Sequence, residues 1–162
     1  MSSVHDGCAL VTGGAGGIGG ASALALAAAG WPVGVNYRAN ADGAASVVAQ
    51  IERDGGRAAP IQGDISELEA VDEIFEAVED RFGPVLVLVN NAGVRADGLA
   101  PQLRDEQWSR VIETNLSAAF RATRRALRAM LKQRFGRVIN IASVVGPRAN
   151  AGQSNYAASK AA

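Results

Sequence analysis

The chain has 162 residues, of which 48% are hydrophobic and 20% charged, and its 16 basic and 16 acidic side chains give no net charge. These values are ordinary for one globular domain and exclude disordered and collagen-like chains. The densest apolar run, residues 85–89, has only strand length, and the first residues lack a secretory signal pattern, so we expect a cytoplasmic protein without a membrane segment. One cysteine (Cys8) and one histidine (His5) exclude an internal disulfide, a histidine triad and a cysteine- or histidine-rich metal site, so no metal is expected.

Apolar runs alternate with helical patterns along the chain. We predict strands at residues 9–11, 33–37, 58–62, 85–89 and 137–141. We predict helices at residues 21–29 and 41–53, after a capping box at Ser66-x-x-Glu69, around 106–114, in a longer stretch from there through 134, and from about 155. This alternation implies right-handed parallel crossovers. We therefore expect one α/β domain over residues 1–162, a doubly wound parallel sheet of the Rossmann type, with ligands at the carboxyl ends of the strands.

A glycine cluster follows the first predicted strand and opens the first predicted helix. It reads Thr12-Gly13-Gly14-Ala15-Gly16-Gly17-Ile18-Gly19. It fits two registers, Gly14-x-Gly16-x-x-Gly19 of the dinucleotide fingerprint and the looser Gly13-x-x-x-Gly17-x-Gly19. In both, glycines let the backbone approach a pyrophosphate whose charge is favoured by helix N-terminal N–H groups. A flexible turn is the alternative, but the position between strand and helix favours a nucleotide.

The ends of the next three predicted strands carry polar residues. An NAD site usually places an acid at the end of the second strand for the ribose 2′-hydroxyl, and Tyr37 and Arg38 stand there instead. Because an arginine can pair with a 2′-phosphate, this favours NADP(H); a solvated arginine is the alternative. Asp64 follows the third strand and Asn-Asn-Ala-Gly at residues 90–93 follows the fourth. Each of these alone is more often a turn or cap residue than a ligand contact.

Tyr156 and Lys160 stand four residues apart near the end of the sequence, which places them on one helix face. A tyrosine is a poor acid or base at neutral pH, but a neighbouring ammonium stabilises the phenolate form and makes the phenol a usable proton donor. A solvent-facing pair is the alternative. Ser143 ends the fifth predicted strand and Asn115 lies inside a helical stretch. By themselves these two indicate only a turn residue and a mild helix misfit.

Basic side chains follow one side of the helical pattern at residues 116–134. They are Arg121, Arg124, Arg125, Arg128 and Lys132. A solvated charged face is the simpler interpretation, and a docking strip for an acidic partner is the sharper one. We expect no nucleic-acid partner, because no aromatic stacking residues are interleaved and no binding motif appears.

In this order, the motifs resemble the short-chain dehydrogenase/reductase family across essentially the whole chain. Residues 12–19 resemble its cofactor turn, residues 90–93 its NNAG segment, and Asn115, Ser143, Tyr156 and Lys160 its four catalytic positions. Within the family, the chain is most similar to 3-oxoacyl-acyl-carrier-protein reductases and acetoacetyl-CoA reductases. The segments that carry this closer similarity are Asp97-Gly98, Arg137-Val138-Ile139-Asn140-Ile141 and Asn155-Tyr156-Ala157-Ala158-Ser159-Lys160.

The resemblance implies reduction of a 3-oxoacyl thioester, carried by acyl carrier protein or coenzyme A, to the 3-hydroxyacyl thioester. NADPH would pass hydride to the carbonyl carbon while Tyr156 donates a proton to the oxygen. Ser143 would hydrogen-bond that oxygen, so that Ser143 and Tyr156 both contact the substrate. Lys160, together with Tyr156, would contact the nicotinamide ribose, and Asn115 would hold a water connected to solvent.

The resemblance also implies the residues that bind NADP(H) and a partner. The cofactor-binding residues are Gly13, Gly14, Ala15, Gly16, Gly17, Ile18, Gly19, Arg38, Asp64, Ile65, Asn91, Ala92 and Gly93, besides Tyr156 and Lys160. Asp64 and Ile65 would contact adenine, residues 91–93 the adjoining ribose, and Arg38 the 2′-phosphate. Arg128 matches a position at which the carrier-protein reductases dock their acidic partner.

Members of this family continue for roughly half as much chain again, which would make a single α/β domain of ordinary size. We therefore expect the C-terminal part of the fold, with the substrate lid and much of a homo-tetramer interface, to be missing from these residues. Because a displacement of about 1 Å can cost about a hundredfold in rate, we expect the 162-residue chain alone to be inactive or poorly folded. The alternatives are a family member acting on a different alcohol or ketone, and a non-catalytic NADP-binding subunit or remnant.

Overall fold

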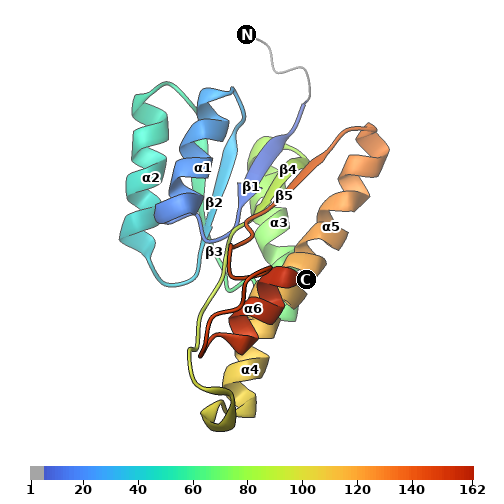
Figure 1. Ribbon diagram of the computed structural model, residues 1–162. Helices are drawn as coiled ribbons and strands as arrows, with labels where there is room; N and C mark the ends of the chain where they lie inside the picture. Colours follow the sequence, from blue (N-terminus) through green and yellow to red (C-terminus); the bar gives the residue numbers. More distant parts are fainter. Residues whose placement is uncertain (1–5) are drawn as a thin grey trace.

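The computed structural model describes residues 6–162 and consists of a sheet with helices on both faces (Figure 1). The strands are β1 (Cys8–Val11), β2 (Val33–Tyr37), β3 (Ala58–Gln62), β4 (Val85–Asn90) and β5 (Arg137–Asn140). The helices are α1 (Gly17–Ala28), α2 (Ala41–Arg53), α3 (Leu68–Phe82), α4 (Asp105–Ile112), α5 (Ala118–Gln133) and α6 (Ser154–Ala161). A short 3₁₀ helix, η1 (Ala100–Gln102), and a π-helical turn, η2 (Glu113–Ser117), complete the elements.

All four strand pairs are parallel, and the order in the sheet is β3-β2-β1-β4-β5. The chain runs outward from β1 to β2 and β3, then returns to the other side of β1 to add β4 and β5. This arrangement confirms the predicted doubly wound α/β fold. Because the direction of winding reverses between β1 and β4, the carboxyl ends of these two strands open a crevice in which proteins of this class bind ligands.

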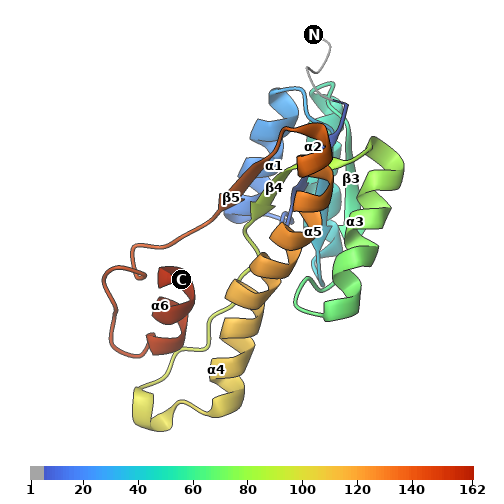
Figure 2. The ribbon, with the colours of Figure 1, turned by 90° about the vertical axis from the view of Figure 1, so that its right-hand side faces the viewer.

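The helices cover the sheet in two layers. Helices α1 and α2 pack on one face and α3 and α5 on the other, each pair over its own buried apolar cluster. Helices α4 and α6 instead lie beyond the carboxyl ends of the strands (Figure 2). No helix within residues 6–162 is both long enough and apolar enough to span a lipid bilayer.

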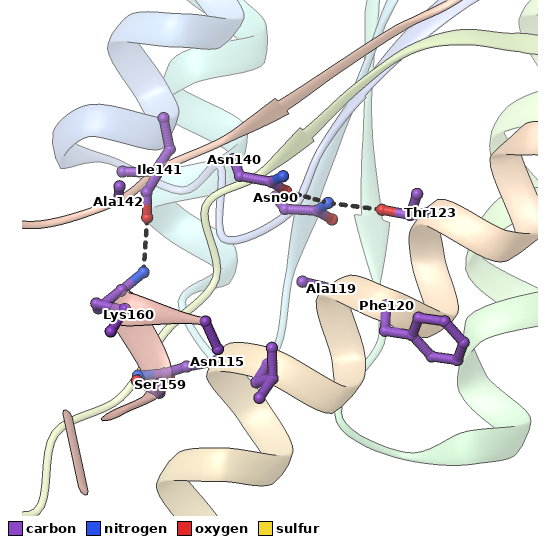
Figure 3. Close-up of a pocket in the computed structure, with 13 residues that line it drawn as sticks. Asn90, Asn115, Ala119, Phe120, Thr123, Asn140, Ile141, Ala142, Ser159 and Lys160 are labelled. Carbon is purple, nitrogen blue, oxygen red and sulfur yellow. Dashed lines mark hydrogen bonds between the residues drawn. The ribbon is translucent and has the colours of Figure 1, made fainter. Parts of the chain in front are cut away.

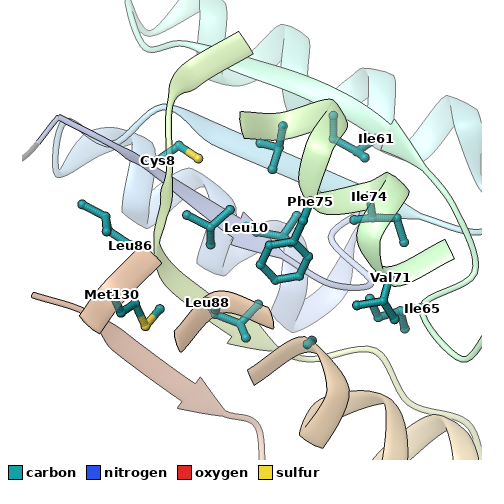
Figure 4. Close-up of a cluster of buried hydrophobic side chains, with 14 of the residues drawn as sticks. Cys8, Leu10, Ile61, Ile65, Val71, Ile74, Phe75, Leu86, Leu88 and Met130 are labelled. Atoms are coloured by element: carbon teal, nitrogen blue, oxygen red, sulfur yellow. The ribbon is translucent and has the colours of Figure 1, made fainter. Parts of the chain in front are cut away.

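The core under α3 and α5 is built on apolar residues at helical spacing. Val71, Ile74, Phe75 and Val78 of α3 are all buried against the sheet (Figure 4). All six residues of β4 are buried, as expected of a strand covered on both faces. On the side of α5, every fourth residue from Ala118 to Met130 packs into the same cluster, and the small alanines let the helix approach the sheet closely.

Three details of the helices differ from the prediction. Helix α1 begins at Gly17 rather than at residue 21, because tertiary contacts overcome the low helix propensity of its glycines. The predicted capping box at Ser66 is wrong: the residue that precedes α3 is Glu67, and the Ser66 hydroxyl donates to Asp64 at 2.6 Å. The two helices predicted between about residues 106 and 134 are present as α4 and α5, but a π-helical turn that was not predicted, η2 with Asn115, stands between them.

Cys8 provides a simple chemical test of this packing. It is the only cysteine in the sequence, lies fully buried in β1, and donates its thiol to the Gly83 carbonyl at 3.1 Å. Burial, and secondarily the charge of Glu79, raise the pKa of the Cys8 thiol to about 12. Because only the thiolate reacts, we expect the native chain at pH 8 to resist a disulfide reagent and the denatured chain to react at least about a hundredfold faster. Rapid labelling of the native chain would show that β1 is not packed as described.

Candidate active site

The predicted site residues gather along the carboxyl edge of the sheet. The glycine turn follows β1, Arg38 follows β2, Asp64 follows β3, and residues 91–93 follow β4. Ser143 lies on the loop after β5, and α6 carries Tyr156 and Lys160 back toward this edge. Segments that are far apart in the sequence thus meet because parallel strands present all their carboxyl ends on one side.

Thr12 joins the glycine turn to the segment after β4. Its buried hydroxyl accepts hydrogen bonds from the backbone N–H groups of Asn91 and Ala92, both at 3.0 Å, and donates to the Val89 carbonyl at 3.2 Å. The Asn91 amide in turn donates to the carbonyls of Thr12 and Gly13 at 2.9 Å each. Sequence reasoning included Thr12 in the turn but assigned it no role. The only available signal was a polar residue at the end of an otherwise apolar strand.

The glycine turn has the shape that an anion site at a helix N-terminus requires. Gly17 has a φ of 55°, and a side chain built on it would meet nothing within 4 Å, so the backbone there faces open space. Gly19 has the opposite constraint, because a Cβ on it would collide with the Asn91 amide and the Gly13 carbonyl. The first turn of α1 contains no acidic residue. Backbone N–H groups and the positive end of the helix dipole can therefore receive a pyrophosphate.

Arg38 and Asp64 lie side by side at the ends of β2 and β3. The Arg38 guanidinium is 3.4 Å from the Asp64 carboxylate, which also accepts hydrogen bonds from the backbone N–H and the hydroxyl of Ser66. Partial burial by itself would raise the pKa of Asp64, but the hydrogen bonds from Ser66 and the neighbouring Arg38 together lower it. Both residues, with Ile65, line a hollow of about 170 Å³ that extends to the Ala92 and Gly93 segment.

Asn115 is buried in the π-helical turn and uses its whole side chain to hold other segments. Its Oδ1 accepts from the Val94 N–H at 2.8 Å, and its Nδ2 donates to the Val94 carbonyl at 3.1 Å and to the Ser159 hydroxyl at 3.0 Å. The amide therefore joins the segment after β4 to helix α6. A π turn widens the helix locally and leaves backbone groups out of the regular pattern, and such turns are frequent at functional sites.

Tyr156 and Lys160 lie on one face of α6, as their spacing predicts. The Lys160 ammonium is 5.9 Å from the centre of the Tyr156 ring and donates to the Ile141 carbonyl at 2.7 Å, so it ties α6 to the end of β5 (Figure 3). Burial lowers the pKa of Lys160. Ser143 is not hydrogen-bonded to Tyr156 here; its hydroxyl accepts from the Val145 N–H at 3.2 Å. The structure thus brings Tyr156 and Lys160 together, with Ser143 on the adjoining loop.

A hollow of about 460 Å³ lies beside Lys160, between the ends of β4 and β5, helix α5 and helix α6 (Figure 3). A string of polar side chains crosses it: the Asn90 amide donates to Thr123 at 3.1 Å and to Asn140 at 2.9 Å. Phe120 and Ile141 supply part of its apolar lining. The hollow is therefore mixed in character, with apolar walls and a polar strip that crosses from the sheet to α5.

The basic strip on α5 is not one uniform surface. Arg121 pairs with Glu113 and donates to the Ser66 carbonyl at 2.8 Å, and Arg125 is held by Asp72 and Glu79 at 2.8 and 2.7 Å. Burial by itself would lower the pKa of Arg125, but these two carboxylates raise it. The interpretation of all five residues as a solvated or docking face is therefore wrong for Arg121 and Arg125, which join α5 to its neighbours.

Arg124 and Arg128 remain on the surface of α5. Arg124 lies over the ring of Phe120 at 5.5 Å, and Arg128 is 4.0 Å from Asp72 with two thirds of its side chain exposed. These two residues and the exposed Lys132 are thus the part of the strip that a partner can reach. Within the part of the chain that the structure describes, no three His, Cys, Asp or Glu side chains are grouped to hold a metal ion.

The fold is that of a doubly wound α/β protein with a glycine turn at the N-terminus of its first helix. The chain belongs to the short-chain dehydrogenase family, whose model matches residues 7–162. It is 44% identical over 161 residues to a 3-oxoacyl-[acyl-carrier-protein] reductase of Synechocystis sp., a match that covers 99% of the chain and 65% of that relative.

Two further relatives have closely related names. The 3-oxoacyl-[acyl-carrier-protein] reductases FabG of Staphylococcus epidermidis and Staphylococcus aureus are both 42% identical to the chain over 153 residues, or 94% of its length. These matches cover 63% and 62% of the two staphylococcal proteins. The chain therefore spans a little under two thirds of the length of the curated relatives described here.

Proposed function

We propose that the chain belongs to an NADP(H)-dependent reductase that converts a 3-oxoacyl thioester into the 3-hydroxyacyl thioester. The observation that carries the proposal is the placement of Tyr156 and Lys160 on one face of α6, with the Lys160 ammonium 5.9 Å from the phenol ring. This pair stands at the edge of the sheet where the glycine turn offers an anion site. The names of the relatives supply the substrate class.

The cofactor fits the residues that are present. The open backbone at Gly17 and the N-terminus of α1 would receive the pyrophosphate. Residues 13–19 would form this turn, Asp64 and Ile65 would contact adenine, and residues 91–93 the adjoining ribose. Arg38 would pair with the 2′-phosphate, and Lys160 and Tyr156 would hold the nicotinamide ribose. When bound, NADPH supplies the hydride that reduces the carbonyl carbon.

Side chains of this protein would donate the proton to the carbonyl oxygen and stabilise the charges that develop during the reaction. As the carbonyl carbon is reduced, its oxygen gains negative charge and takes the proton of the Tyr156 hydroxyl, which yields the alcohol. Ser143 would donate a hydrogen bond to the same oxygen and stabilise the developing charge. The Lys160 ammonium beside the ring stabilises the phenolate that Tyr156 leaves behind. Asn115, whose side-chain amide is bonded to Val94 and Ser159, would hold a water that connects the site to solvent.

Arg38 gives a test of cofactor choice. We expect Arg38→Ala to weaken NADPH binding by about tenfold or more while NADH binding changes little, because only NADPH has a 2′-phosphate for a charge-assisted hydrogen bond. Arg53 in the last turn of α2 is a matched control, since Arg53→Ala removes an exposed arginine away from the site. Fluorescence titration of both nucleotides measures the two constants. Equal losses for NADPH and NADH would contradict the assignment.

The acyl carrier would be the acidic acyl carrier protein, with Arg128 as a docking residue. The exposed guanidiniums of Arg124 and Arg128 support this, because positive surface charge steers an acidic partner. We also propose a homo-tetramer, as is usual in the family. Exposed apolar side chains on α5, Phe120 and Leu131 among them, are consistent with a covered surface in such an assembly.

The test is NADPH oxidation by the full-length gene product, followed at neutral pH with three substrates. These are acetoacetyl-CoA, an acetoacetyl thioester of acyl carrier protein, and a simple ketone that lacks a thioester. Turnover of the thioesters alone supports the proposal. Preferred turnover of the simple ketone would indicate a reductase with another substrate, whereas NADPH binding without turnover of any substrate would indicate a non-catalytic subunit.

A further inference from the structure

Asn155 is fully buried in the first turn of α6, directly before Tyr156, and has no part in the site described above. A buried primary amide is costly unless its donors and acceptor are satisfied, so its partners show what it holds. Its Oδ1 accepts the backbone N–H of Tyr156 at 2.8 Å. Its Nδ2 donates to the Ala96 carbonyl at 2.9 Å and lies 3.5 Å from the Gln107 carbonyl.

These contacts join three segments. Ala96 belongs to the segment after β4, Gln107 to helix α4, and Tyr156 to α6. The N–H of Tyr156 is one of the first four of its helix, which have no acceptor within the helix. Asn155 therefore provides an acceptor for an N–H group that has none within the helix. Through the same side-chain amide, it attaches the first turn of α6 to the segment after β4 and to α4.

Hydrogen bonds attach both turns of α6 to other segments of the chain. Its second turn is attached through Ser159 to Asn115 at 3.0 Å. Its first turn is attached through Asn155, and the preceding turn through Gly152, whose carbonyl accepts the Gly98 N–H at 2.8 Å. Among these, only Asn155 bonds to Tyr156 itself at its N–H.

We propose that Asn155 is a positioning residue for Tyr156: by bonding the Tyr156 N–H and the Ala96 carbonyl together, it fixes where the phenol stands relative to the segment after β4. The catalytic consequence rests on the proposed function, in which Tyr156 donates the proton. The structural consequence does not, because it concerns the Tyr156 N–H alone. Loss of this positioning would lower the reaction rate, since a displacement of about 1 Å at a reacting group can lower the rate about a hundredfold.

Two substitutions separate the two halves of the amide. Asn155→Ala removes both the acceptor for Tyr156 and the donor to Ala96, whereas Asn155→Asp keeps an acceptor oxygen and loses the donor. Asn150→Ala is a matched control, because Asn150 is exposed on the loop that precedes α6 and its amide reaches only Gln153. If Asn155→Ala does not fold, Asn155→Ser keeps a short polar side chain at the position and replaces it in the comparison.

The first measurement needs neither cofactor nor substrate. The sequence has two tyrosines, Tyr37 and Tyr156. Labelling the full-length protein with ¹⁵N-tyrosine therefore gives one backbone amide signal for each of them. If the full-length protein has further tyrosines, the signals of these two are identified by assignment. We expect hydrogen exchange at the Tyr156 amide to become at least about tenfold faster in Asn155→Ala, with Tyr37 unchanged. In Asn155→Asp the Tyr156 amide should stay protected. Unchanged protection of Tyr156 in Asn155→Ala would overturn the proposal, whatever the protein catalyses.

The second measurement is steady-state kinetics. We expect Asn155→Ala to lower kcat by about ten- to a hundredfold, with much smaller changes in KM for the thioester and in the NADPH Kd, because the phenol is displaced while the other binding residues stay in place. A role in folding alone would instead reduce binding, thermal stability and kcat together, and that result would contradict a positioning role. Wild-type kcat in Asn155→Ala would also overturn it. Absence of turnover in the wild type would refute the proposed function. The hydrogen-exchange measurement at the Tyr156 amide would then by itself test whether Asn155 positions Tyr156.

Discussion

Replacing Tyr156 by Phe is expected to lower kcat by about a hundredfold to ten-thousandfold, the usual contribution of a general acid. The substitution removes one hydroxyl and keeps the ring, so the contact with the Lys160 ammonium at 5.9 Å can persist. The Tyr156 N–H stays bonded to Asn155, and α6 keeps its attachments. The loss should therefore appear mainly in proton donation, with a much smaller change in the NADPH Kd, since Tyr156 is only one of the residues proposed to contact the cofactor.

The only other tyrosine in the sequence provides the control. Tyr37→Phe removes the phenol at the end of β2, on the adenine side of the edge, and should leave kcat near the wild-type value. Initial rates of NADPH oxidation across substrate concentrations separate kcat from KM, and fluorescence titration gives the Kd. If Tyr156→Phe retained more than about a tenth of the wild-type kcat, another group would have to supply the proton.

The second large effect is expected for Thr12→Val, which replaces the hydroxyl at the junction of β1 and β4 by a methyl group. The N–H groups of Asn91 and Ala92 would lose their acceptor, at a cost of about 1–3 kcal/mol for each buried group left unsatisfied. We expect the free energy of unfolding to fall by about 2–4 kcal/mol, a large part of the 5–15 kcal/mol typical of a domain. Urea titration followed by circular dichroism measures it.

Thr12→Ser is the matched control, because it keeps the hydroxyl and removes only the methyl group. It should recover most of the lost stability. NADPH binding should follow the same order, since residues 91–93 are placed by these hydrogen bonds. Equal stabilities of Thr12→Val and the wild type would show that the two N–H groups find other acceptors, and that Thr12 does not hold the junction.

Sequence reasoning located best the elements whose bounds are set by residues that are neighbours in the sequence. The bounds of β2, β3 and α2 match the prediction, because each of these segments stands between proline, glycine or polar residues in the sequence. The start of α1 and the cap of α3 were predicted wrongly. In both places, partners outside the local sequence decided the structure: tertiary contacts hold the glycines in helix, and Asp64 takes the Ser66 hydroxyl that would have capped α3.

By itself, the sequence determined the parallel α/β order, the glycine turn between β1 and α1, and the common face of Tyr156 and Lys160. These features depend on residue type and on spacings of a few residues. Only the tertiary structure decided that Thr12 holds Asn91, that Asn115 and Asn155 attach α6 at its two turns, and that Arg121 and Arg125 are occupied by ion pairs. The physical reason is that each of these bonds joins groups from distant parts of the chain, so the partner is chosen by how the helices pack on the sheet.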